Sequence, residues 1–161
     1  MSAPRVVYDT MVFLQAAVRP NRRYATIDAA EDGRVILCTS PDGIAEVRDV
    51  LTRPSLAAKF SALTPERVAQ FLDSVGVMAT SFSAVPAVFT WPQHPNDDHL
   101  FNLAIHTKAE YLVTWEERIL KLATDATPAA DLLRRLAPNL SIVTPKQLAE
   151  LLKSQPPPTS G

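Results

Sequence analysis

Cysteine and glycine are scarce in this chain, with one cysteine and four glycines among 161 residues. The single cysteine, Cys38, ends the apolar run Val35–Cys38, so we expect a buried thiol in a reducing compartment and neither a disulfide nor a zinc ligand. No glycine-rich loop opens a helix, which argues against a nucleotide-binding protein.

Long apolar runs and a strong net charge are also missing. No stretch approaches the roughly 18 apolar residues that span a bilayer, and the run near the N-terminus is broken by Asp9. We therefore expect a cytoplasmic protein with neither a signal peptide nor a membrane partner. The net charge of -1, from 16 basic and 17 acidic residues, excludes a surface that is basic throughout. Nucleic acid would have to bind through a local basic patch, for which Arg48 and Arg53 are candidates.

Short apolar runs that suit buried strands alternate with segments that begin like helices. Glycine C-caps predict that a helix from about Tyr24 ends near Gly33, and that a helix from Pro65 ends near Gly76. A hydroxyl residue followed by proline predicts helix starts at Ser40-Pro41, Thr64-Pro65 and Thr144-Pro145. The expected strands are Val6–Tyr8, Val35–Cys38, Val75–Ala79, Tyr111–Val113 and Ser141–Val143.

This alternation predicts the fold class. Apolar strands without strict period-two patterning indicate an α/β three-layer sandwich, with a mostly parallel central sheet flanked by helices on both faces. We expect one domain over residues 1–153, followed by a disordered proline-rich tail over 154–161. The stretch Ser83–Pro95 contains three prolines and is expected to be an ordered loop.

Acidic residues occur where such a fold gathers ligands. Asp9 and Glu116 each follow a predicted strand, and the carboxyl ends of parallel strands line one crevice. Glu46 lies in the helix that follows the second strand, while Asp97 and Asp98 open a later helix. Acidic residues at helix starts are also common as caps, which need no ligand.

Several carboxylates in one crevice repel each other unless a cation or a proton intervenes. Oxygen ligands favour a hard ion, so we expect Mg²⁺ or Mn²⁺ and not Zn²⁺. Such an ion can lower the pKa of a bound water and stabilise the charge on a leaving oxygen, which indicates metal-assisted phosphodiester hydrolysis.

Five segments occur in an order typical of one family. They are Val6–Thr10, Thr39–Leu51, Pro95–Ala104, Tyr111–Glu116 and Ile142–Pro145. Each segment is weak evidence alone, but their ordered combination resembles the PIN-domain family, and in particular a bacterial branch of toxins from toxin–antitoxin pairs. The resemblance covers most of the chain.

The resemblance implies a Mg²⁺- or Mn²⁺-dependent endoribonuclease. It makes Asp9, Glu46, Asp97 and Glu116 the metal-binding catalytic residues, with Asp98 beside them as a further ligand. RNA is then the substrate, and a cognate antitoxin peptide that occludes the crevice is the expected partner. The oligomeric state stays open, a homodimer included.

The chain departs from the family pattern at four positions. Met11 stands where asparagine is usual, His94 where this branch often has aspartate, Trp115 where a small residue is usual, and Glu116 replaces an aspartate. These departures support an alternative, a catalytically degenerate PIN-fold module that binds RNA or protein. A haloacid-dehalogenase-like phosphatase also has an aspartate after its first strand, but it needs a second one at position 11.

Other polar and aromatic residues have ordinary interpretations. We expect His94 and His99 to be exposed loop residues without a role at the site, and His106 to be structural. Trp91 and Trp115 can stack on unpaired bases, but packing is the commoner role of aromatic residues in a small α/β domain.

Overall fold

A parallel β-sheet forms the centre of the computed structural model, which describes residues 3–155. Its strands are ordered β3-β2-β1-β4-β5, and every neighbouring pair is parallel. The strands are β1 (Arg5–Tyr8), β2 (Ile36–Thr39), β3 (Ala79–Ser81), β4 (Tyr111–Val113) and β5 (Ser141–Val143). The predicted three-layer α/β architecture is confirmed, since helices cover both faces of this sheet.

Alternation along the strands divides the buried side chains between two cores. Val6 and Tyr8 of β1 belong to one core and Val7 to the other, and Leu37 and Cys38 of β2 are divided in the same way. Because both faces are buried, the strands are apolar at consecutive positions rather than at every second one. Cys38 is a buried free thiol, as expected.

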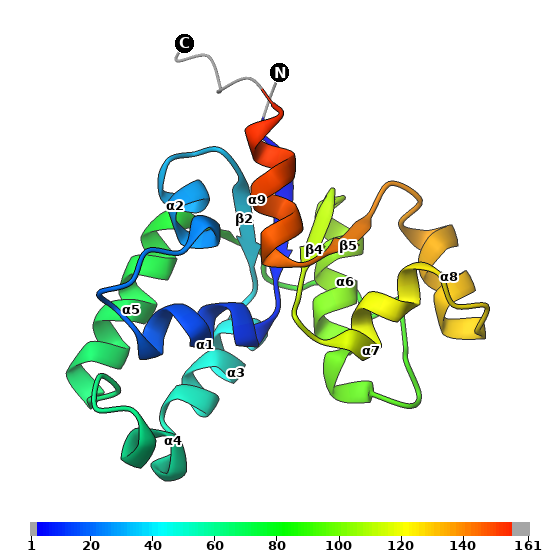
Figure 1. The fold of residues 1–161 in the computed structure, drawn as a ribbon. Coiled ribbons are helices and arrows are strands. Elements are labelled where there is room, and N and C mark those ends of the chain that lie inside the picture. The colour runs from blue at the N-terminus through cyan, green and yellow to red at the C-terminus, as the bar shows by residue number, and fades with distance from the viewer. Residues whose placement is uncertain (1–2, 156–161) are drawn as a thin grey trace.

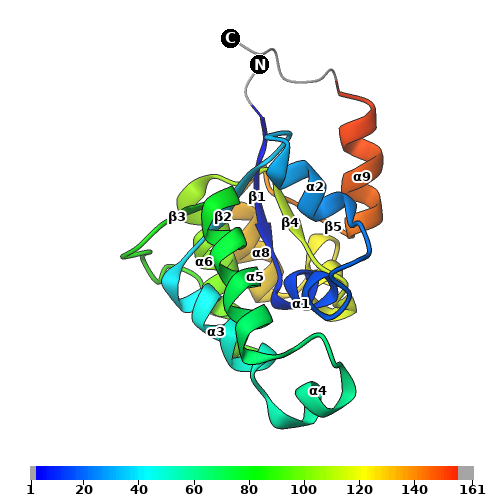
Figure 2. The ribbon, with the colours of Figure 1, turned by 90° about the vertical axis from the view of Figure 1, so that its left-hand side faces the viewer.

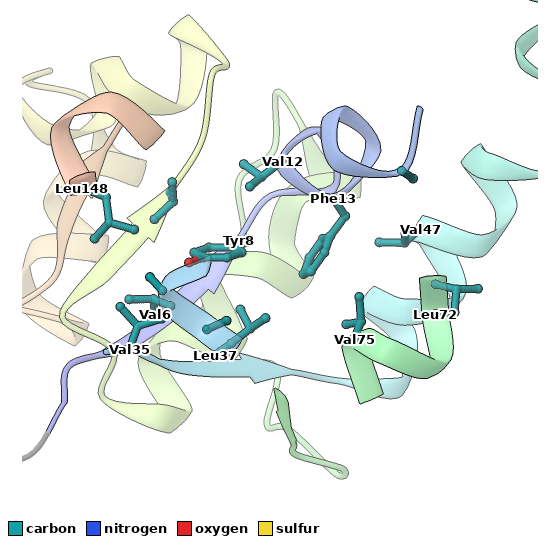
Figure 3. Packing of buried hydrophobic residues seen from close by; sticks show 14 of the residues in the cluster. Val6, Tyr8, Val12, Phe13, Val35, Leu37, Val47, Leu72, Val75 and Leu148 are labelled. Carbon is teal, nitrogen blue, oxygen red and sulfur yellow. The ribbon is translucent and has the colours of Figure 1, made fainter. Parts of the chain in front are cut away.

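The first core lies under five helices. Tyr8, Leu37, Val47, Val75 and Leu148 mark this face in Figure 3, where side chains from sheet and helices converge. The helices are α1 (Thr10–Val18), α2 (Ala25–Glu31), α3 (Pro41–Leu51), α5 (Pro65–Met78) and α9 (Pro145–Lys153).

The second core lies on the opposite face of the sheet. In Figure 1, α6, α7 and α8 stand on the other side of the strands from α2 and α5. These helices are α6 (Asp98–Thr107), α7 (Glu117–Leu120) and α8 (Pro128–Leu136), with the short turns η1 (Pro95–Asp97) and η2 (Lys121–Ala123). A further helix, α4 (Pro54–Lys59), buries no residue and projects at one end of the molecule (Figure 2). No helix among residues 3–155 has the length and apolar character needed to cross a membrane.

The three predicted helix starts are confirmed. The side chain of Ser40 accepts a hydrogen bond from a backbone N–H in the first turn of α3, at 3.1 Å. Thr64 caps α5 in the same way, and Thr144 forms a full capping box with Gln147 at the start of α9. The sequence contains a fourth start of this type, Thr127-Pro128, which begins α8.

The predicted strand at Val75–Ala79 is wrong, and so is the predicted helix end at Gly76. Helix α5 continues through Gly76 to Met78, and β3 begins only at Ala79. The spacing of Val68, Leu72 and Val75, which are all buried, follows the helical repeat. The next apolar residue, Val77, is 90% exposed, so this short apolar run is not a buried strand.

The loop that joins β3 to η1 is ordered, as predicted. It inserts Phe89 and Trp91 into the second core, both buried. The buried side chain of Asn102 holds its backbone, accepting from the N–H groups of Val88 and Phe89 at 2.9 and 2.8 Å and donating to the carbonyl of Phe89 at 3.1 Å. The domain boundary at residue 153 stays a prediction. Of the predicted disordered tail, 154–161, Ser154 and Gln155 each donate a hydrogen bond to a carbonyl of α9, and the other residues lie outside the described range.

Two glycines with opposite backbone requirements give a matched stability test. Gly76 lies inside α5, where an added Cβ meets nothing within 4 Å, so Gly76→Ala should raise the free energy of unfolding by about 0.5–1 kcal/mol. Gly33 follows α2 with a φ of 72°, so Gly33→Ala should lower the free energy by about 1–2 kcal/mol. Urea unfolding of both variants measures these changes, and a destabilised Gly76→Ala protein would contradict the helical assignment.

Candidate functional site

Four acidic residues lie at the carboxyl edge of the sheet or on helices that start there. Asp9 directly follows β1 and is the N-cap residue of α1, and its backbone N–H donates to the carbonyl of Val113 at 2.9 Å. Glu116 follows β4 as the N-cap residue of α7. Asp97 ends η1 as the N-cap residue of α6, and Glu46 lies in α3. The helix N-termini here favour negative charge.

Asp9 is the most buried of these acids, at 6% exposure. Burial raises the pKa of its carboxyl, the charges of Asp97 and Glu116 raise it further, and a hydrogen bond from Thr114 opposes them. The Thr114 hydroxyl donates to Oδ2 of Asp9 at 2.9 Å and accepts from the backbone N–H of Glu116 at 3.0 Å. Thr114, the first residue after β4, therefore links Asp9, the first residue after β1, to the backbone of Glu116.

Arg118 in α7 joins two of the carboxylates. One guanidinium nitrogen donates to Oδ2 of Asp97 at 2.9 Å, and another donates to Oε2 of Glu116 at 2.7 Å. Burial acts to lower the pKa of Arg118, but the hydrogen bond that Arg118 donates to Asp97 and the charges of Asp97, Glu116 and Asp9 outweigh it and raise the pKa. Asp9, Asp97 and Glu116 thus share one electrostatic environment that contains a cation.

Glu46 belongs to an adjacent network. Its Oε2 accepts a hydrogen bond from the Thr10 hydroxyl at 2.9 Å and lies 2.7 Å from Nε2 of His99. Thr10 follows Asp9 in the chain, so consecutive residues contribute to the two networks. His99 lies in the first turn of α6 and is not an exposed loop residue, because its side chain is only 25% exposed.

Asp98 makes a different contact from the other acids, with the backbone of the loop before η1. Its Oδ1 accepts from the backbone N–H of Trp91 at 2.8 Å, which attaches the ordered loop to the start of α6. His94 packs edge-on against Trp91, with ring centroids 4.5 Å apart. The structure therefore places Asp98 in a contact that supports the loop.

Sequence reasoning missed Thr10, Thr114 and Arg118, and it wrongly gave His99 no role at the site. Thr114 directly follows β4 and Thr10 is the second residue after β1, and these positions could have suggested them. His99 and Arg118 gave a weaker signal, since nothing in the local sequence indicates which carboxylate each one meets.

The donor chemistry of the site fits a hard divalent cation. Asp9, Asp97 and Glu116 supply carboxylate oxygens. Burial raises the pKa of Asp9 most, and the charges of Asp97 and Glu116 add a repulsion that a bound cation would relieve. Over residues 3–155, however, no three His, Cys, Asp or Glu side chains are arranged as a ready-made metal site. Two of the three carboxylates are engaged by Arg118 instead.

Exposed side chains surround the networks. Met11 at the start of α1 is 41% exposed and Trp115 after β4 is 46% exposed, whereas Trp91 is buried. The predicted packing role is thus correct for Trp91 alone. A cavity of about 550 Å³ adjoins the site on the side of His99, and its walls include Ser40, Phe82 and Asn102.

A family comparison agrees with this arrangement. A model described as a PIN domain matches residues 5–118, which is more than half of the 161-residue chain. The chain therefore belongs to the PIN-domain family. PIN domains are in general nucleases that bind nucleic acid, and they usually use Mg²⁺ or Mn²⁺. Comparisons with curated proteins and with solved structures find no match.

The raised pKa of Asp9 predicts a pH-dependent stability difference. Because the folded pKa lies above the unfolded value near 3.8, the folded state binds the proton more tightly. The free energy of unfolding should then fall as the pH rises from about 3.8 through the folded-state pKa of Asp9. Asp9→Asn removes this loss, so in EDTA the variant should gain most over the parent near pH 7 and least near pH 4.

Urea unfolding across this pH range measures the difference. Asp73→Asn is the control, because Asp73 is an exposed acid on α5. A gain for Asp9→Asn that is the same at every pH would show that the folded protein does not raise the pKa of Asp9.

Proposed function

We propose that this protein is a Mg²⁺- or Mn²⁺-dependent endoribonuclease that hydrolyses RNA phosphodiesters with a metal-activated water. The observation that carries the proposal is the convergence of Asp9, Asp97 and Glu116, from three separate segments, around one positive charge. Burial, and then the charges of Asp97 and Glu116, raise the pKa of the Asp9 carboxyl, and a bound cation would offset both effects.

In this proposal Asp9, Asp97 and Glu116 hold the ion, and Glu46 joins them from α3. When bound, the ion lowers the pKa of a water molecule and stabilises the charge that develops on the leaving oxygen. Thr114 orients the carboxylate of Asp9, while Thr10 and His99 orient that of Glu46. Such outer contacts fix the geometry of metal ligands.

Asp98 is not part of the proposed ligand set. Its carboxylate binds the backbone of the loop, so we assign it a structural role at the start of α6. The sequence had suggested it as a further ligand because it adjoins Asp97, but neighbours on a helix point about 100° apart.

The surroundings support an RNA substrate. Exposed Trp115 offers an aromatic face for an unstacked base, beside the carboxylate of Glu116. The cavity next to His99 is large enough for a nucleotide and combines apolar walls with polar groups. Arg48 is exposed on the same helix as Glu46 and can contact a phosphate.

We further propose that the nuclease is the toxin of a type II toxin–antitoxin pair in the bacterial cytoplasm. The support is the resemblance of the chain, including its closing segment Ile142–Pro145, to a bacterial branch of such toxins. Expression of the parent, but not of Asp9→Asn, should then arrest bacterial growth. A short adjoining reading frame whose product restores growth would identify the antitoxin.

One observation favours a second candidate, an inactive PIN-fold module that binds RNA or a protein. Arg118 already neutralises two of the carboxylates, so the fold does not require an ion for charge balance. RNA binding without cleavage, unaffected by Mn²⁺, would support this candidate over the nuclease.

Two adjacent aspartates provide the decisive activity test. Asp97→Asn should lower metal-dependent cleavage of a fluorescent single-stranded RNA by more than about 100-fold, because it removes a ligand. Asp98→Asn should retain most of the activity, because its amide oxygen can still accept from Trp91. Rates are measured with Mg²⁺, with Mn²⁺ and with EDTA.

The same assay tests the other ligands. Asp9→Asn and Glu46→Gln should also lose cleavage, whereas Asp49→Asn is a matched control, since Asp49 is an exposed acid on the helix of Glu46. Equal losses for Asp97→Asn and Asp98→Asn would disprove the assignment of the two aspartates. Cleavage that persists in EDTA would disprove the metal-dependent reaction.

A further inference from the structure

Arg118 occupies the position between two carboxylates where the proposed function requires a divalent ion. We propose that Arg118 is a built-in counter-cation that competes with the ion for Asp97 and Glu116 and thereby sets the metal affinity of the site. This inference rests on the proposed function, because it concerns the ion that the nuclease would use.

The contacts of Arg118 resemble those of a bridging ion. Its guanidinium does not form a fork with one carboxylate, the usual bidentate geometry of arginine. It divides its donors between Asp97, 21 residues away in the chain, and Glu116, at 2.9 and 2.7 Å. The charge of Asp9 also acts on the guanidinium, so three proposed ligands act on the same cation.

A guanidinium and a divalent ion cannot share these oxygens without loss. A carboxylate oxygen that accepts a hydrogen bond from Arg118 uses a lone pair that is then not free to coordinate a metal ion. A second cation at contact distance from the same two carboxylates would be repelled by the first, and partial burial weakens the screening of that repulsion by water. Metal binding should therefore require Arg118 to leave.

The structure also indicates that Arg118 can leave. Its side chain is 39% exposed, so a path to solvent is open. Its Nε is buried and has no hydrogen-bond partner among residues 3–155, so the inserted position leaves one donor unsatisfied. The long side chain can release both carboxylates through rotations about its own bonds, without a change in the fold.

A purely positioning role would have the opposite effect on metal affinity. If Arg118 only aligned Asp97 and Glu116 for the ion, its removal would weaken metal binding, as the loss of an outer contact usually does. If Arg118 competes with the ion, its removal must tighten binding. The sign of the change therefore separates the two roles.

The test is a titration of the full chain with MnCl₂ alone, followed by calorimetry and by thermal unfolding. Arg118→Met should bind Mn²⁺ more tightly than the parent, by roughly 5- to 150-fold, the usual range for two coupled sites. In EDTA the same variant should unfold at a lower temperature, because the carboxylates lose their counter-cation. Added Mn²⁺ should then raise its unfolding temperature more than that of the parent.

Two further variants control for folding and for charge. Lys121→Met removes a cation one turn away that pairs with exposed Glu117, at 3.6 Å, and it should leave Mn²⁺ affinity unchanged. Arg118→Lys keeps the positive charge on a long flexible side chain, although a single ammonium replaces the guanidinium, so its affinity should stay closer to the parent than that of Arg118→Met.

The outcomes separate this inference from the proposed function. Tighter binding by Arg118→Met supports the competition. Equal or weaker binding than the parent overturns it and leaves the metal-dependent nuclease in place. If neither the parent nor any Arg118 variant binds Mn²⁺, both the inference and the metal-dependent function are wrong.

Discussion

Mutual repulsion among the carboxylates at one edge of the sheet is the constraint on which the rest of the site depends. Parallel strands end at the same edge, so the residues after β1 and β4 are forced together whatever their charge. The Thr114 hydroxyl donates a hydrogen bond to Asp9, and the guanidinium of Arg118 pairs with Asp97 and Glu116. Each of these contacts offsets part of the repulsion. The same repulsion is what a bound metal ion would relieve under the proposed function.

The two cores keep these groups in place. Both faces of the sheet are buried, so the strand ends cannot shift without disturbing two layers of packing at once. Asn102 and Asp98 attach the long loop to α6, and this attachment fixes the start of the helix from which Asp97 and His99 reach the site. Residues that play no part in the proposed chemistry thus determine its geometry.

The departures from the family pattern fall into two kinds. Met11 and Trp115 are exposed beside the site and take no part in the carboxylate networks, so they alter the surface that a substrate meets. Glu116 lies inside the networks, where its carboxylate meets Arg118 at 2.7 Å. If the proposed competition holds, movement of the Arg118 side chain alone would convert a site that holds its own cation into one that can bind a metal ion.

The sequence by itself determined the features that depend on neighbouring residues. A serine or threonine followed by proline predicted the starts of α3, α5 and α9, and apolar runs predicted four of the strands. The order of the acidic segments indicated the family. The run at Val75 was misread because a short apolar stretch fits a strand or a helix equally well until its packing partners are known.

Contacts between distant residues were decided by tertiary structure alone. Thr114 meets Asp9 across 105 residues and Arg118 meets Asp97 across 21, and no local pattern specifies such pairs because only the folded sheet brings them together.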